Sequence, residues 1–97
     1  MIEIDKIAVK GKSTAETIYT CFKPGIKFPE GFLDNHILFL AEYRAQNWNA
    51  ANLLIDELMS SSNELELYYR HMQTRIEEYI TNPPSADWGG VYVATNK

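Results

Sequence analysis

The stretch VKGK at positions 9–12 and the run ETIYTCF at positions 16–22 decide the fold of this chain. Gly11 permits the positive φ angles at which a chain can reverse its direction. β-Branched and aromatic residues are frequent on both sides of this glycine, which is typical of strands. The residues at 13–15 carry no strand signal, so the connecting loop is long. We therefore expect a β-hairpin over the first 22 or so residues.

The charge of the chain is unevenly distributed along its 97 residues, which carry −4 in total. Positions 1–27 hold five lysines against three acids, a balance of +2, and positions 28–97 hold four basic residues against ten acids, a balance of −6. Nucleic acid is not an expected partner of the helical part, because phosphates bind basic faces. No apolar run approaches the roughly 20 residues of a membrane span, so no direct membrane contact is expected.

A connector at 24–31, rich in Pro and Gly, precedes the first of three predicted helices. This helix should begin at about Glu30 or Phe32 and end at Gln46, and we expect it to be the most buried of the three. Its apolar residues form two adjacent rows, Phe32, His36, Phe39 and Tyr43 in one and Leu33, Ile37 and Leu40 in the other.

The second helix is predicted from Trp48 to about Ser60, antiparallel to the first, and the third from about Glu64 to Thr81. Asn63 and Glu66 resemble a capping box at the start of the third helix. The run at 91–95 predicts a short strand, which is not stable alone in water. It should add to the hairpin edge or dock on the helices, so the predicted fold class is α+β.

The hairpin and the tail together resemble the C-terminal region of a bacterial class III adenylate or guanylate cyclase. The VKGK and TIY elements within positions 9–19 resemble the closing hairpin of the cyclase domain. Trp48-x-x-Ala51 followed by PPxxxWxGVY at 83–92 resembles the tail that follows this domain in enzymes with a CHASE2 sensor. Gly89 departs from that tail, in which an Asp is common at this position.

The resemblance divides the chain into a closing hairpin at 1–23, a linker at 24–31, and a helical extension with its terminal strand at 32–97. Within the extension, the order Trp48, Ala51, Ile55 also resembles the second helix of a tetratricopeptide repeat. Met1 begins almost inside a strand, so we expect the chain to be a fragment of a longer protein. The extension would cap the catalytic sheet or mediate self-association.

The resemblance implies that the parent is a dimeric enzyme that converts ATP to cyclic AMP and pyrophosphate with Mg²⁺ or Mn²⁺. It implies that Lys10 reaches the nucleotide phosphates across the dimer interface, whereas Lys12 is expected to face solvent. The alternative for Lys10 is a solvated turn lysine. The partners would be the remainder of the cyclase domain and its dimer mate, in the cytoplasm, with the parent anchored in the inner membrane through an upstream sensor.

The fragment alone is not expected to be an enzyme. It lacks a pair of metal-binding aspartates on adjacent strands and an Asn-x-x-x-Arg helix, and two-metal chemistry needs those carboxylates. No cofactor or metal is predicted here, since Cys21 is the single thiol and the two histidines lie on different helices. We expect His36 to be packed at the core and His71 to be exposed. Cys21 should be buried or at a sheet edge, in keeping with a reducing cytoplasm.

Two other functions stay open at this point. The chain could be a free-standing helical module, similar to a tetratricopeptide repeat, that binds a peptide or a partner protein. Trp48, Trp88 and Tyr92 are then the candidate contact residues, although aromatic residues at helical spacing also serve as core. A small enzyme that uses Cys21 and a histidine is the least favoured reading.

Overall fold

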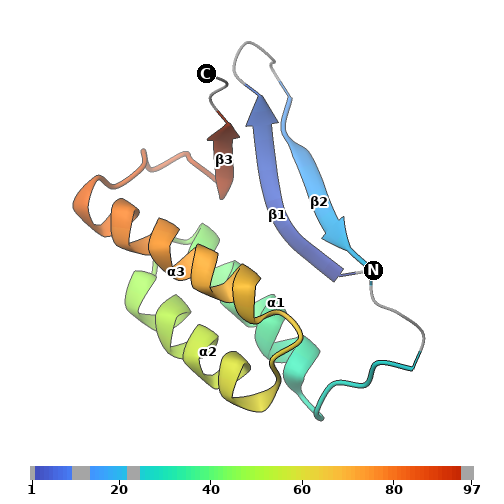
Figure 1. The fold of residues 1–97 in the computed structure, drawn as a ribbon. Helices are drawn as coiled ribbons and strands as arrows, with labels where there is room; N and C mark the ends of the chain where they lie inside the picture. Colours follow the sequence, from blue (N-terminus) through green and yellow to red (C-terminus); the bar gives the residue numbers. More distant parts are fainter. Residues whose placement is uncertain (1, 10–13, 22–24, 95–97) are drawn as a thin grey trace.

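The computed structural model describes residues 2–9, 14–21 and 25–94, and it has the predicted α+β fold (Figure 1). The predicted hairpin and terminal strand are confirmed. Strands β1 (Ile2–Val9) and β2 (Glu16–Thr20) pair antiparallel, while β3 (Val91–Ala94) pairs parallel with β1. The strand order β2-β1-β3 places the first strand of the chain at the centre of the sheet.

Three helices follow the hairpin, close to their predicted bounds: α1 (Phe32–Arg44), α2 (Trp48–Ser61) and α3 (Glu66–Thr81). Figure 1 shows α1 and α3 between the sheet and α2, with α2 antiparallel to α1. The break between α1 and α2 is tight because Gln46 adopts a positive φ of 64°. The molecule is therefore built of a sheet, a pair of helices and an outer helix.

The apolar core lies among the three helices, and each helix contributes one buried stripe. Aromatic residues from α1 and α3 fill much of it, and Phe39 and Tyr69 are fully buried. The buried hydrophobic residues are Phe32, Phe39, Leu40, Tyr43, Ala51, Ile55, Leu58, Leu65, Tyr69, Met72 and Ile76. In α1 the helical spacing correctly predicted the core members Phe32, Phe39, Leu40 and Tyr43.

Two local predictions are wrong. The expected capping box at Asn63 does not form, because α3 begins at Glu66 and its N-terminus has no side-chain cap. A turn takes the place of this cap, with the Glu64 amide donating to the Ser62 hydroxyl at 3.3 Å. The second apolar row of α1 is only partly in the core: Leu40 is 4% exposed, but Leu33 is 43% and Ile37 is 65% exposed.

Candidate functional site

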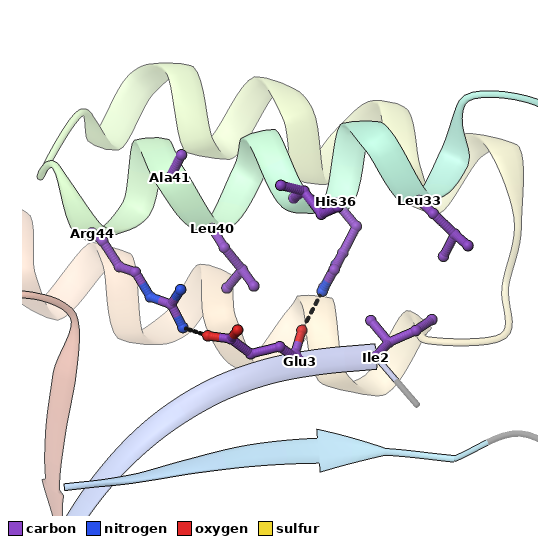
Figure 2. Close-up of a pocket in the computed structure, with 8 residues that line it drawn as sticks. Ile2, Glu3, Leu33, His36, Leu40, Ala41 and Arg44 are labelled. Atoms are coloured by element: carbon purple, nitrogen blue, oxygen red, sulfur yellow. Dashed lines mark hydrogen bonds and ion pairs between the residues drawn. The ribbon is translucent and has the colours of Figure 1, made fainter.

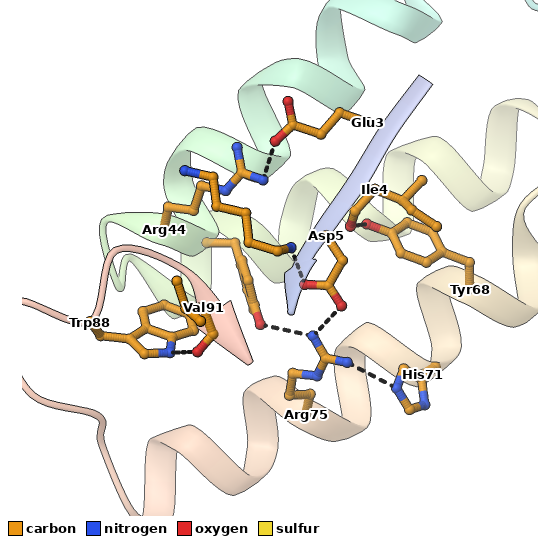
Figure 3. A network of polar contacts seen from close by, with 11 residues as sticks. Glu3, Ile4, Asp5, Arg44, Tyr68, His71, Arg75, Trp88 and Val91 are labelled. Atoms are coloured by element: carbon orange, nitrogen blue, oxygen red, sulfur yellow. Dashed lines mark hydrogen bonds and ion pairs between the residues drawn. The ribbon is translucent and has the colours of Figure 1, made fainter. Parts of the chain in front are cut away.

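A buried ion pair joins the sheet to the helices (Figure 3). Nη1 of Arg75, on α3, donates to Oδ2 of Asp5, on β1, at 2.8 Å, and the two side chains are only 7% and 8% exposed. The same Nη1 donates to the Tyr43 hydroxyl at 3.2 Å, and Nη2 donates to Nε2 of His71 at 3.2 Å. The aromatic ring of Tyr92 lies 4.0 Å from the guanidinium carbon. Arg75 therefore contacts both β1 and β3.

The pKa values around this pair follow from burial and from charge. Burial raises the pKa of the Tyr43 hydroxyl well above its usual value, so this group stays a neutral hydrogen-bond partner. Burial alone would lower the pKa of Arg75, but its hydrogen bonds to Tyr43 and Asp5 raise it. Arg75 is thus a permanent cation that lies between the Asp5 carboxylate and neutral aromatic side chains. Its contacts hold β1 and α3 together.

His36 joins α1 to β1 and to α3. Its Nε2 lies 2.7 Å from the carbonyl oxygen of Glu3, and its Nδ1 lies 2.8 Å from the Tyr69 hydroxyl. Because a carbonyl can only accept, Nε2 carries the proton, and the neutral ring accepts the Tyr69 hydrogen at Nδ1. Burial lowers the pKa of His36, although the bond to Glu3 opposes this shift. His36 is a packed, satisfied histidine, as the sequence predicted.

The start of β1 is attached to the helices through main-chain groups as well as side chains. The pairing of β1 with β2 shifts in register between Glu3 and Asp5, an irregularity that takes main-chain groups out of the regular ladder. The Tyr68 hydroxyl donates to the carbonyl oxygen of Ile4 at 2.5 Å. Arg44 of α1 forms an ion pair with the side chain of Glu3. This region of β1 is thus fixed to both α1 and α3.

A pocket of about 420 Å³ lies between this part of β1 and α1 (Figure 2). Its walls are apolar except for His36, which is hydrogen-bonded to the Glu3 carbonyl, and the Glu3–Arg44 ion pair, in which Nε of Arg44 is buried without a hydrogen-bond partner among the described residues. The lining residues are Ile2, Glu3, Leu33, His36, Ile37, Leu40, Ala41 and Arg44. The exposed row of α1 therefore forms a wall of this pocket.

The structure brings together two of the three aromatic contact candidates. The ring centroids of Trp48 and Trp88 are 5.8 Å apart, and both rings also pack on Tyr79, at 5.4 and 5.0 Å. Both tryptophans are half-buried. The indole nitrogen of Trp88 donates to the carbonyl of Val91 at 2.6 Å, which fixes the start of β3. Tyr92, the third candidate, lies over Arg75.

The other candidates from the sequence are placed as follows. Lys10 and Lys12 lie outside the described residues. Cys21 is exposed directly after β2, so the buried alternative is wrong, and His71 is exposed as predicted. In the described ranges no group of three or more His, Cys, Asp or Glu side chains could hold a metal ion. No helix in these ranges is long and apolar enough to cross a bilayer.

Sequence reasoning missed the pairing of Asp5 with Arg75. Each residue gave a signal of its own: Asp5 alternates with the apolar residues of β1, and Arg75 falls within the apolar stripe of α3. The position of Arg75 indicates a charge on a buried face, whereas strand alternation places Asp5 on the face opposite Ile2 and Ile4, and neither signal identifies the partner 70 residues away.

Comparison with known proteins gives no relative for this chain, since no family model, no curated protein and no solved structure matches it.

Proposed function

We propose that this chain is the C-terminal region of a class III adenylate or guanylate cyclase. Residues 1–23 would close the catalytic sheet, and residues 32–97 would be a structural or regulatory extension without chemistry of its own. The parent would be a lyase that forms cyclic AMP and pyrophosphate from ATP in the cytoplasm, anchored in the inner membrane through an upstream sensor. Its Mg²⁺ or Mn²⁺ would be held by carboxylates outside this chain.

The observation that carries the proposal is a hairpin whose outer strand is open to further pairing. Within the described ranges β2 pairs with β1 alone, and Tyr19 on it is 52% exposed. An unpaired strand edge is a template for another strand. The remainder of a cyclase sheet and its dimer mate are the proposed partners of this edge and of the pocket beside β1.

The VKGK sequence falls between the end of β1 at Val9 and the start of β2 at Glu16. In the proposal, the ammonium group of Lys10 stabilises the negative charge that develops on the phosphates as pyrophosphate leaves. A charge-assisted contact of this kind contributes about 1.5–3 kcal/mol.

The test uses the protein encoded by the complete reading frame, with Lys10→Ala and Lys12→Ala as a matched pair from the same turn. We expect Lys10→Ala to lower kcat/KM for ATP roughly 10- to 150-fold, since each 1.4 kcal/mol is a factor of about ten. Lys12→Ala should keep its activity. Equal kinetics for the two variants would remove Lys10 from the site, and a reading frame without a cyclase core would end the proposal.

A second candidate is the peptide-binding module, which a shallow groove beside Trp48 favours. This groove, of about 570 Å³, is also lined by Glu42, Ala50 and Ile80, and Ile80 is 50% exposed. A partner peptide that binds there would change the tryptophan fluorescence, and a Trp88→Phe variant would assign the change to Trp48. A cyclase core in the upstream reading frame would count against a free-standing module.

A further inference from the structure

A second groove, of about 320 Å³, lies on the surface between α1 and α2. We call it the acidic groove, and its residues are Leu38, Glu42, Ala50, Leu53, Leu54 and Glu57. Leu38 is 48% exposed and Leu53 is 67% exposed. Large apolar side chains that line a common depression mark a surface that can bind another molecule.

The charges around the acidic groove have one sign. Asp34, Leu38 and Glu42 follow one another at intervals of four residues, so they form one row along α1. On α2, Glu57 lies one turn beyond Leu53 in the same manner. Acids therefore flank Leu38 in both directions along α1, and Leu53 in one direction along α2.

No opposite charge on these helices compensates the groove. In the described α1 and α2, Arg44 is the one basic residue, and it is paired with Glu3 on the side of the sheet. The acidic groove would therefore repel an anionic membrane surface or a nucleic acid. It would attract a positively charged ligand that also carries apolar groups.

We propose that the acidic groove binds an amphipathic helix that carries leucine-like residues flanked by Lys or Arg. The leucines of the partner would pack between Leu38 and Leu53, and its basic side chains would reach Glu42 and Glu57. A helix laid into a groove between two helices is a common mode of peptide recognition. The inference rests on the second candidate function, a peptide-binding module, but places the peptide in the acidic groove and not beside Trp48, and it is independent of the cyclase proposal.

The test titrates the 97-residue chain against a labelled synthetic peptide of Leu and Lys, about four helical turns long, and follows fluorescence anisotropy. The matched control peptide has Glu in place of every Lys. We expect the Lys peptide to bind at least about tenfold more tightly, because charge complementarity selects between them. Equal binding of the two peptides would overturn the proposal.

Variants of the chain locate the binding surface. Leu53→Ser should weaken binding about tenfold or more, because a buried leucine contact is lost. Glu57→Gln should weaken it about threefold at low salt and less as salt is added. Leu67→Ser is the control, since Leu67 is 84% exposed on α3, away from the acidic groove, and this variant should bind like the wild type.

Three other outcomes would identify a different binding site or a different occupant of the acidic groove. Binding that is lost in Trp48→Ala but kept in Leu53→Ser would leave a binding module but place its site elsewhere, and it would overturn this inference. Sedimentation that shows a dimer of the wild type and a monomer of Leu53→Ser would make a second copy the occupant. Binding of the chain to anionic phospholipid vesicles through Leu53 would likewise contradict it.

Discussion

Asp5 and Arg75 join β1 to α3, and both side chains are nearly inaccessible to solvent. Two opposite charges in such a place cost free energy to desolvate and regain it only through close pairing. The arginine has three hydrogen-bonding neighbours, Asp5, Tyr43 and His71, and the ring of Tyr92 covers it. Removal of one charge should therefore be far more harmful than removal of both.

We predict that Arg75→Met lowers the free energy of unfolding by about 3–5 kcal/mol, because it leaves the Asp5 carboxylate buried without a cation. The double variant Asp5→Asn/Arg75→Met should regain part of this loss. Urea unfolding followed by circular dichroism measures both. An Arg75→Met variant within 1 kcal/mol of the wild type would mean that the pair is not held as described.

His36 makes stability depend on pH. Its pKa is lowered below 6.5 in the folded chain, so the unfolded chain binds a proton at pH values where the folded chain does not. The contribution is fully present above about pH 6.5 and is lost as the pH falls toward the folded pKa, by at most about 1.4 kcal/mol per pH unit.

This dependence is checked with urea midpoints measured at a series of pH values in wild type, His36→Gln and His71→Gln. The His36→Gln profile should be flatter than that of the wild type just below pH 6.5. His71→Gln is the control, since it replaces the other histidine and leaves His36 in place, and it should retain the slope that His36 causes. Parallel profiles for all three proteins would show that His36 is not the group responsible.

At the scale of elements, β3 reaches its place beside β1 through a turn of two glycines. Gly90 is buried with a φ of +86°, and a Cβ at this position would overlap Cγ of Arg44 and lie 3.0 Å from Cδ. Gly89 has a φ of +63° but its nearest neighbour would be 3.9 Å away. A residue with a Cβ would have a strained backbone at either position, but only at Gly90 would the Cβ also overlap a neighbouring side chain.

We predict that Gly89→Ala costs about 1–2 kcal/mol through the left-handed backbone alone. Gly90→Ala should cost about 1–3 kcal/mol more, because it also displaces Arg44 from its ion pair with Glu3. Thermal unfolding of the two variants side by side measures the difference. Equal losses of stability in the two variants would show that the Arg44 side chain can move aside without destabilising the fold.

The elements themselves were predictable because their signals are local. Alternating β-branched residues on either side of VKGK predict the hairpin, and the apolar rows of the first helix predict most of the core residues that α1 contributes. The Leu33 and Ile37 row shows the limit of this reasoning. Apolar spacing places the row on one helix face, but it does not tell which element, if any, covers that face.

The candidate site was less predictable because its contacts join distant parts of the chain. Asp5 meets Arg75 and His36 meets the Glu3 carbonyl only after the sheet has packed on the helices. The aromatic candidates Trp48 and Trp88 were found by residue type, and the structure places them in one cluster. Lys10 rests on resemblance and stays a prediction.

At the scale of the whole molecule, β1 is both a strand of the sheet and the element that attaches the sheet to the helices. β1 is the centre of the sheet, and the same strand bonds to α1 through His36 and Arg44 and to α3 through Tyr68 and Arg75. A cyclase sheet that continued from this hairpin would therefore be mechanically joined to the helical extension. The proposed structural or regulatory role of the extension depends on this attachment of β1 to α1 and α3.

Residue-resolved amide hydrogen exchange of the intact chain tests the attachment of β1 to α1 and α3 most directly. We expect the hydrogen-bonded amides of β1 to open with about the same free energy as those in the middle of α1 and α3, because they unfold as one cooperative unit. Exchange of the β1 amides at nearly unprotected rates, while α1 and α3 remain protected, would contradict this expectation.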